Sequence, residues 1–207
     1  MLTKEQLNIL SVFKKDIFAS LTFKQIKQQC RQRSNNIVQI ALKEFQKQAI
    51  VKTNEIGDVT THSLNLNNNL SLSYLNLINE SEIHKIRLPK KILEEIQGRI
   101  FKHTEFFILA VFGSYAKNKA TQKSDLDVAI IVESKQTKKE IAPYLETIKR
   151  REVIKLDYHI FTRAEFLEML NTDLENVGKQ IFKDSVIYYG YIPYCNMLKG
   201  RRNEWRS

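Results

Sequence analysis

The sequence predicts an α+β protein of two domains: an N-terminal part of helices and a hairpin, then a larger part built on a mixed sheet flanked by helices. Two observations support this prediction. Apolar residues recur at helical spacing through the first fifty positions, and two strand-like segments joined by a turn follow them. From Phe106 onward the pattern changes to apolar runs typical of strands, interrupted by a glycine turn. The chain of 207 residues is long enough for two small hydrophobic cores.

The composition excludes several classes of protein. Hydrophobic residues make up 43% of the chain, which is too many for a disordered protein. No apolar run approaches the roughly 18 residues that a membrane span needs, and the N-terminus MLTKEQLNIL has charges where a secretory signal is apolar. Cys30 and Cys195 belong to no C-x-x-C pair, which argues against both a disulfide framework and a zinc site. We therefore expect a cytoplasmic protein with inert thiols and no membrane partner.

The charge favours an anionic partner. The formal net charge is +10 at pH 7, which suits a nucleic acid or a nucleotide without choosing between them. Residues 22–52 hold seven basic residues against one acidic residue, a surplus of six. A second basic cluster ends the chain, with Lys199, Arg201, Arg202 and Arg206 against Glu204. A solvated surface or a disordered tail is the alternative interpretation of either cluster.

Three helices and a hairpin are expected in the N-terminal part. Thr22 and Ser34 are suited to cap the second and third helices. Strands are expected around Ile50–Thr53 and Val59–Leu66, with a turn at Gly57-Asp58. The apolar faces of the three helices are Leu7, Leu10, Phe13 and Ile17; Phe23, Ile26 and Cys30; and Val38, Ala41, Leu42 and Phe45.

The order of three helices and a hairpin, with a polar third helix after a short turn, resembles the winged helix-turn-helix family across about residues 3–66. In that family the third helix enters the major groove of duplex DNA and the hairpin wing contacts the backbone. The resemblance implies that base edges are contacted by Asn36, Gln39 and Lys43. It implies that phosphates are contacted by Lys47 and Lys52. The alternatives are a protein-interaction module, or a polar helix face that is only solvated.

The rest of the chain is divided by turn residues and helical spacing. An Asn-rich stretch at residues 65–69 marks a boundary, and a connecting helix with apolar positions from Tyr74 to Ile83 follows it. Pro89 suits the first turn of another helix, which runs through Ile100. The domains expected are a winged helix-turn-helix at 1–70, a connecting helix at 71–87, a larger domain built on the mixed sheet at 88–195 and a basic tail at 196–207.

The segment FFILAVFGSYAKNKATQKSDLDVAIIVES predicts a strand, a glycine turn, a short helix and a second strand. Gly113 ends the first strand where the turn requires conformational freedom or close backbone approach. Ser114 follows at the N-terminus of the short helix, a place that attracts phosphate. Asp125 and Asp127 are two residues apart on the second strand, so both carboxylates share one face.

Paired carboxylates repel each other unless a cation lies between them. A hard cation such as Mg²⁺ (or Mn²⁺) prefers oxygen ligands and brings a triphosphate with it. A third strand, EVIKLDYHIF, contains Asp157 in an apolar setting, with Lys155 and His159 on the same face. Because a lone aspartate is disfavoured in a strand, the presence of Asp157 requires a reason beyond strand propensity.

The string GSYA, followed by SDLD and by an aspartate on a later strand, resembles the minimal nucleotidyltransferases of the DNA polymerase β superfamily across roughly residues 88–192. The ending GKQIFKDSVIYYG is similar to the last helix and strand of that family. The resemblance implies that Asp125 and Asp127 bind two Mg²⁺ ions and that Asp157 activates the incoming hydroxyl. It also implies that Gly113 and Ser114 hold the β- and γ-phosphates. One departure is Asn118, where many members of the family have glycine.

Two hypotheses about function result from these resemblances. The first is an enzyme that transfers a nucleoside monophosphate, AMP from ATP as the first choice, to an acceptor that the sequence does not identify. Minimal relatives often belong to toxin–antitoxin pairs, so the resemblance favours a protein acceptor, and a homodimer is also considered. The second is a DNA-binding transcriptional regulator whose nucleotidyltransferase-like domain senses nucleotide or binds a partner without catalysis. The complete set of three aspartates favours the enzyme.

Overall fold

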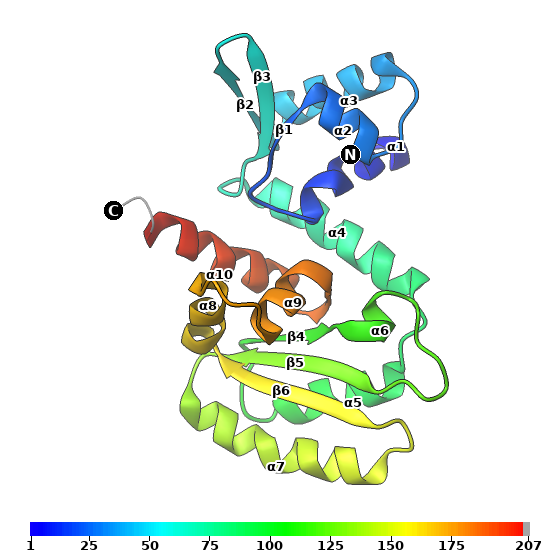
Figure 1. Ribbon diagram of the computed structural model, residues 1–207, viewed down its shortest axis with the longest axis vertical. Coiled ribbons are helices and arrows are strands. Elements are labelled where there is room, and N and C mark those ends of the chain that lie inside the picture. The colour runs from blue at the N-terminus through cyan, green and yellow to red at the C-terminus, as the bar shows by residue number, and fades with distance from the viewer. Residues whose placement is uncertain (205–207) are drawn as a thin grey trace. The chain divides into compact units, whose positions relative to one another are not determined.

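The computed structural model describes the backbone of residues 1–204 and the side chains of residues 1–200. The chain divides into two compact units, one at Met1–Ile78 and one from Asn79 onward (Figure 1). Helix α4, Asn69–Lys85, spans this boundary and corresponds to the connecting helix expected at 71–87. Among the described residues, none of the helices combines the length and the apolar character that crossing a membrane requires.

The first unit contains short helices and a small antiparallel sheet. Its strands have the order β1-β3-β2. Its helices are α1 Lys4–Leu10, the 3₁₀ helix η1 Ser11–Lys14, α2 Phe23–Gln29 and α3 Asn35–Lys47. Its strands are β1 Ser20–Thr22, β2 Val51–Ile56 and β3 Val59–Leu64. The three helices and the hairpin that the sequence predicts are therefore present, in the expected order.

Side-chain caps fix where α2 and α3 begin. The Thr22 hydroxyl accepts a hydrogen bond from the Gln25 backbone N–H, while the Gln25 side chain accepts one from the Thr22 N–H at 2.8 Å. This reciprocal capping box satisfies two N–H groups that the helix itself leaves without partners. The Ser34 hydroxyl accepts from the Ile37 N–H in the same way. Both caps predicted from the sequence are confirmed.

The start of the chain differs from the prediction. The apolar spacing predicts one helix reaching Ile17, whereas the α-helix ends at Leu10 and a 3₁₀ turn follows. The Asp16 carboxylate accepts a hydrogen bond from the Phe18 N–H at 2.9 Å, a local turn that ends the helical path. Ile17 is nevertheless buried, so its apolar character reflects the core rather than a helix face.

The Asn-rich boundary segment closes the end of α3. The Asn65 side-chain amide donates to the Ala49 carbonyl at 2.9 Å. The Asn68 amide donates to the carbonyls of Gln48 and Ala49, both at 2.9 Å. Ala49 has a φ of +52°, which ends the helix in a left-handed turn and directs these carbonyls toward the asparagines. The asparagines thus satisfy backbone groups at a helix terminus.

The second unit is a four-stranded mixed sheet with the order β6-β5-β4-β7. Strands β5 and β6 are parallel, while β4 is antiparallel to both β5 and β7. Its strands are β4 Phe107–Val111, β5 Leu126–Val132, β6 Leu156–Thr162 and β7 Val186–Tyr189. Its helices after α4 are α5 Lys90–Ile100, α6 Gly113–Ala116, α7 Lys135–Arg151, α8 Arg163–Asn171, α9 Val177–Asp184 and α10 Tyr191–Glu204. The predicted mixed sheet flanked by helices is confirmed.

The two faces of this sheet have different roles. Helices α5 and α7 cover one face, and α8, α9 and α10 lie on the other (Figure 1). Leu126, Val128 and Ile130 of β5 join the core that α5 and α7 form with the sheet. Because side chains alternate along a strand, Asp127 belongs to the opposite face. The fold therefore places Asp127 on the face of the sheet opposite the core formed with α5 and α7.

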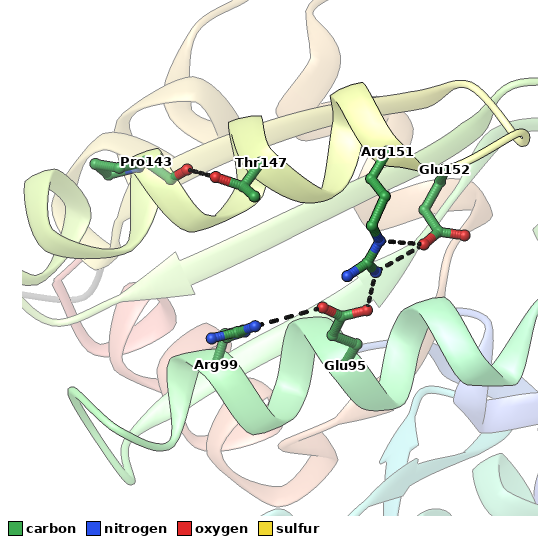
Figure 2. Close-up of polar contacts among 6 residues, drawn as sticks. All are labelled: Glu95, Arg99, Pro143, Thr147, Arg151 and Glu152. Atoms are coloured by element: carbon green, nitrogen blue, oxygen red, sulfur yellow. Dashed lines mark hydrogen bonds and ion pairs between the residues drawn. The ribbon is translucent and has the colours of Figure 1, made fainter.

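A polar network fastens α5 to α7 at the molecular surface (Figure 2). The Arg151 guanidinium donates to the Glu152 carboxylate at 2.7 Å and also to the Glu95 carboxylate. Arg99, one helical turn from Glu95, pairs with the same carboxylate at 3.8 Å. The hydrogen bond from Arg151 is the main cause of a lowered pKa at Glu95. Exposed pairs of this kind add little stability individually, so the apolar core remains the main support of the unit.

The C-terminal helix replaces part of the expected basic tail. Helix α10 continues to Glu204, through residues assigned by sequence to a tail beginning at 196. Met197 and Leu198 are buried, and their burial holds this helix against the unit. The basic residues indicate a solvated segment, whereas the apolar residues beside them are packed against the unit. Residues 205–207 of the expected tail lie outside the described residues.

Candidate functional site

The three candidate carboxylates come from neighbouring strands. Asp125 lies directly before β5, Asp127 lies within β5, and Asp157 lies within β6. The Cα atoms of Asp127 and Asp157 are register partners in the parallel β5–β6 pair. Neighbouring strands are about 4.8 Å apart, so the two residues are adjacent and share one face of the sheet. The structure thus brings together strand positions that are thirty residues apart in the chain.

The electrostatics of these residues show that their charges act on one another. Burial raises the pKa of the Asp127 carboxyl, and the charges of Asp157 and Asp125 raise it further. His159 and Lys155 act in the opposite direction. A carboxylate whose neighbours are also negative favours a proton or a cation. The site is therefore a suitable environment for a divalent cation.

Two basic side chains flank the carboxylates. The Lys155 ammonium donates to Asp125 Oδ2 at 2.6 Å, and this contact raises the pKa of Lys155. His159 Nε2 lies 4.0 Å from Asp157 Oδ2. The sequence places Lys155 and His159 on the face of Asp157. It does not reveal the Lys155–Asp125 contact, which depends on how β5 and β6 are aligned.

Gly113 is required at its position for two separate reasons. Its φ is +67°, in the left-handed region that L-residues rarely adopt. A Cβ atom at this position would lie 2.0 Å from Asp127 Oδ2, well inside van der Waals contact. The adjacent Phe112 N–H donates to the Asp127 carbonyl at 3.0 Å and fixes the approach of the two segments. The glycine turn is thus packed directly against a candidate metal ligand.

The short helix α6 carries Ser114 and ends at Ala116, and Asn118 lies in the turn that follows it. The Asn118 N–H donates to the Tyr115 carbonyl at 3.0 Å, and the Lys119 N–H donates to the Ser114 carbonyl at 2.9 Å. Asn118 has a φ of +53°. Asparagine is the non-glycine residue that tolerates this conformation best, so the turn keeps the left-handed geometry expected of a glycine. The departure from the family pattern at Asn118 leaves the backbone turn intact.

The carboxylates have the chemistry of a Mg²⁺ or Mn²⁺ site, although the ligands are not gathered around one point. Among the described residues, no group of three or more His, Cys, Asp or Glu side chains is close enough to hold a metal ion. The oxygen donors of Asp125, Asp127 and Asp157 are nevertheless those that hard divalent cations prefer. The placement of Gly113 against Asp127 also leaves no room for a side chain there. The residues therefore fit a hard divalent cation in donor type.

A cavity of about 580 Å³ lies beside the loop that follows α6. Sequence reasoning missed most of its lining, which comes from three separate segments. A guanidinium, an aromatic ring and two amides lie in its walls, a mixture that suits a polar ligand with a flat apolar part. The lining residues are Arg87, Leu88, Pro89, Tyr115, Asn118, Ala120, Thr121, Gln122 and Ile154.

The candidate DNA-contacting residues lie together on the first unit. Asn36, Gln39 and Lys43 are exposed on α3, opposite its buried face of Val38, Ala41, Leu42 and Phe45. Lys47 is the exposed last residue of α3, and Lys52 is exposed on β2. The predicted polar helix face therefore exists, with a lysine on the neighbouring strand.

A mixed sheet with aspartates on adjacent parallel strands beside a glycine turn is consistent with a nucleotidyltransferase fold. Residues 90–190 match the family described as polymerase beta, nucleotidyltransferase. The matching segment runs from α5 through β7, so it contains the whole sheet, the Gly113–Ser114 turn and the three aspartates. The match supports the polymerase β superfamily for this part of the chain and nucleotidyl transfer as its class of activity. Comparison with curated proteins and with solved structures found no match.

Proposed function

We propose that the protein is a metal-dependent nucleotidyltransferase that transfers a nucleoside monophosphate, AMP from ATP as the first choice, to an acceptor hydroxyl. One observation supports this function above the others. Asp127 and Asp157 are register partners on parallel strands, and the Gly113 turn packs against the Asp127 carboxylate. The family match covers this arrangement.

The roles of the residues follow from their positions. Asp125, Asp127 and Asp157 would hold two Mg²⁺ or Mn²⁺ ions, which supply charge neutralisation for the triphosphate when bound. The backbone of Gly113 and Ser114, at the start of α6, would hold the β- and γ-phosphates. Asp157 would accept the proton of the acceptor hydroxyl.

The transfer is an in-line displacement. The acceptor oxygen forms a bond with the α-phosphorus, and the bond from that phosphorus to the oxygen bridging it to the β-phosphorus breaks. Pyrophosphate leaves, and the hydroxyl proton passes to Asp157. The proposed acceptor is a protein, on the resemblance to minimal nucleotidyltransferases of toxin–antitoxin pairs, and a homodimer belongs to the same proposal.

Transfer is tested with ATP labelled in either the α- or the γ-phosphate. The protein is incubated with Mg²⁺ and with soluble proteins, RNA or the chain alone as acceptors, and Asp125→Ala is the control. We expect the α-label on an acceptor and the γ-label in pyrophosphate. Transfer of the γ-label, or release of orthophosphate alone, would contradict the proposal. Metal-dependent ATP binding without any transfer would instead support the alternative, a regulator that senses nucleotide.

We further propose that the first unit is a winged helix that binds duplex DNA. The order of α1, α2 and α3 before the β2–β3 hairpin supports this proposal, as does the exposed face of Asn36, Gln39 and Lys43. The surplus of six positive charges in residues 22–52 falls on the same segment. Lysines contribute sequence-independent attraction to phosphates, while amides are suited to reading adenine edges.

Removing Lys43 or Lys47 is expected to weaken binding to duplex DNA of any sequence. Lys43→Ala or Lys47→Ala should reduce affinity for duplex DNA and lower the slope of log affinity against log salt by about 0.9 for each phosphate that the lysine neutralises. Lys139→Ala, an exposed lysine of α7 in the second unit, is the matched control and should leave both unchanged. Gel-shift titrations over a salt series measure these quantities.

Substituting an amide is expected to change sequence preference instead. Asn36→Ala or Gln39→Ala should alter discrimination between sites by about 1–3 kcal/mol while leaving the salt slope in place. Selection of bound sequences from a random duplex pool measures the preference. A folded protein that binds no duplex at about 50 mM salt would contradict DNA binding and favour a role for this unit in protein contacts.

A further inference from the structure

We infer that Lys155 is a built-in counter-ion of Asp125 that competes with the divalent cation and so weakens metal binding at the carboxylates. The inference rests on the proposed function and adds a residue that tunes the metal affinity of the site. It depends on a contact that the family match does not describe, the 2.6 Å hydrogen bond from Lys155 Nζ to Asp125 Oδ2.

The backbone places Lys155 beside Asp125, so the contact does not depend on a flexible side chain alone. The Leu126 N–H donates to the Lys155 carbonyl at 2.8 Å, which joins the first residue of β5 to the residue just before β6. Lys155 is two residues before Asp157, and alternation along the strand puts both side chains on the carboxylate face. The ammonium therefore reaches the edge of the site where Asp125 lies.

The ammonium and the metal compete for the same oxygen lone pairs. A carboxylate oxygen that accepts a hydrogen bond at 2.6 Å from Lys155 cannot at the same time be a close ligand of a divalent cation along that direction. The metal must displace the ammonium before Asp125 can complete a ligand set with Asp127 and Asp157. The ion pair with Lys155 therefore lowers the affinity of the carboxylates for the metal.

The solvent exposure of Lys155 and Asp125 determines how much their contact changes metal affinity. The Lys155 side chain is 72% exposed and that of Asp125 37% exposed, so solvent screens the pair. Exposed ion pairs change an equilibrium by about two- to fivefold. The contact is therefore weak enough for a metal–nucleotide complex to displace and strong enough to measure in a binding titration.

Mn²⁺ binding to the full-length protein without nucleotide tests the inference, with free Mn²⁺ measured by electron paramagnetic resonance. Lys155→Met is compared with wild type and with Lys139→Met, which removes the same charge from an exposed position on α7. We expect Lys155→Met to bind Mn²⁺ about two- to fivefold more tightly than Lys139→Met. The same titrations are repeated with a non-hydrolysable ATP analogue, which shows whether the carboxylate site binds the metal at all.

The outcomes separate this inference from the proposed function. If wild type binds Mn²⁺ but Lys155→Met binds it no more tightly than Lys139→Met does, the counter-ion role is wrong and the carboxylate site remains. If none of the three proteins binds Mn²⁺ with or without the ATP analogue, the proposed function and the inference both fail. Lys155→Arg keeps the positive charge and should restore affinity close to that of wild type.

Discussion

Asp127→Asn is expected to abolish nucleotidyl transfer and, at the same time, to make the protein more stable when no divalent cation is present. Transfer should fall by about 1,000-fold, since removal of a metal ligand takes away several kcal/mol of transition-state stabilisation. Stability should rise because burial and the charges of Asp157 and Asp125 disfavour the Asp127 carboxylate. The substitution keeps the shape of the side chain and removes only its charge.

The pH dependence of this stabilisation follows from the direction in which the pKa of Asp127 is shifted. The pKa of Asp127 in the folded protein is raised above its ordinary value of 3.8, so the folded state binds this proton more readily than the unfolded state. Stability is therefore lost as pH rises from about 3.8 through the raised pKa, and the loss persists at neutral pH. The stabilisation by Asp127→Asn should be small at pH 3 and full at pH 7.

Thermal unfolding in EDTA and in Mg²⁺, at both pH values, measures the effect. Asp173→Asn, an exposed aspartate between α8 and α9, is the control and should change neither transfer nor stability. Added Mg²⁺ should stabilise wild type and leave Asp127→Asn nearly unchanged, because the variant lacks one metal ligand. A variant that is less stable than wild type in EDTA at pH 7 would show that Asp127 has a structural role instead.

Gly113→Ala is expected to have the second-largest effect on activity. An alanine at a φ of +67° costs about 1–2 kcal/mol in backbone strain. Its Cβ would lie 2.0 Å from Asp127 Oδ2, so the carboxylate must move away. A displacement of about 1 Å at a reacting centre can cost about 100-fold in rate, and we expect a loss of at least that size.

Gly98→Ala provides the matched control for this substitution. Gly98 lies in α5, and a Cβ there would meet no atom within 4 Å. Alanine in a helix is more stable than glycine by about 0.5–1 kcal/mol, so this variant should be fully active and slightly more stable. Transfer assays and circular dichroism melts of both variants measure the contrast. Gly113→Ala with wild-type activity would rule out the close packing of the turn against Asp127.

The parts of the fold that follow from local rules could be predicted from the sequence. Alternation along a strand put Asp125 and Asp127 on one face, and the register of β5 with β6 then placed Asp157 beside them. The caps at Thr22 and Ser34 were predictable because a short polar side chain before an apolar repeat satisfies exposed N–H groups. The shared face of Asp125 and Asp127 and the two caps each depend on a few neighbouring residues, whereas the register of β5 with β6 is a tertiary feature.

Other features depend on tertiary contacts that no local pattern shows. Strand β1 is three residues long, too short for a periodic signal, and exists because Leu21 pairs with His62 of β3. The segment after residue 196 is rich in basic residues, whereas burial of Met197 and Leu198 packs this part of α10 against the unit. The contact of Lys155 with Asp125 requires the alignment of two strands and could not be read from either segment alone.

The dependence of ATP binding on a divalent cation tests the central claim most directly, because it requires no knowledge of the acceptor. Calorimetric titration with a non-hydrolysable ATP analogue, in Mg²⁺ and in EDTA, compares wild type with Asp127→Asn. Paired carboxylates repel a triphosphate until a cation neutralises them, so wild type should bind at least about tenfold more tightly in Mg²⁺. Asp127→Asn should lose most of that gain. Equal affinity of wild type with and without Mg²⁺ would contradict a metal-dependent nucleotide site at Asp125, Asp127 and Asp157.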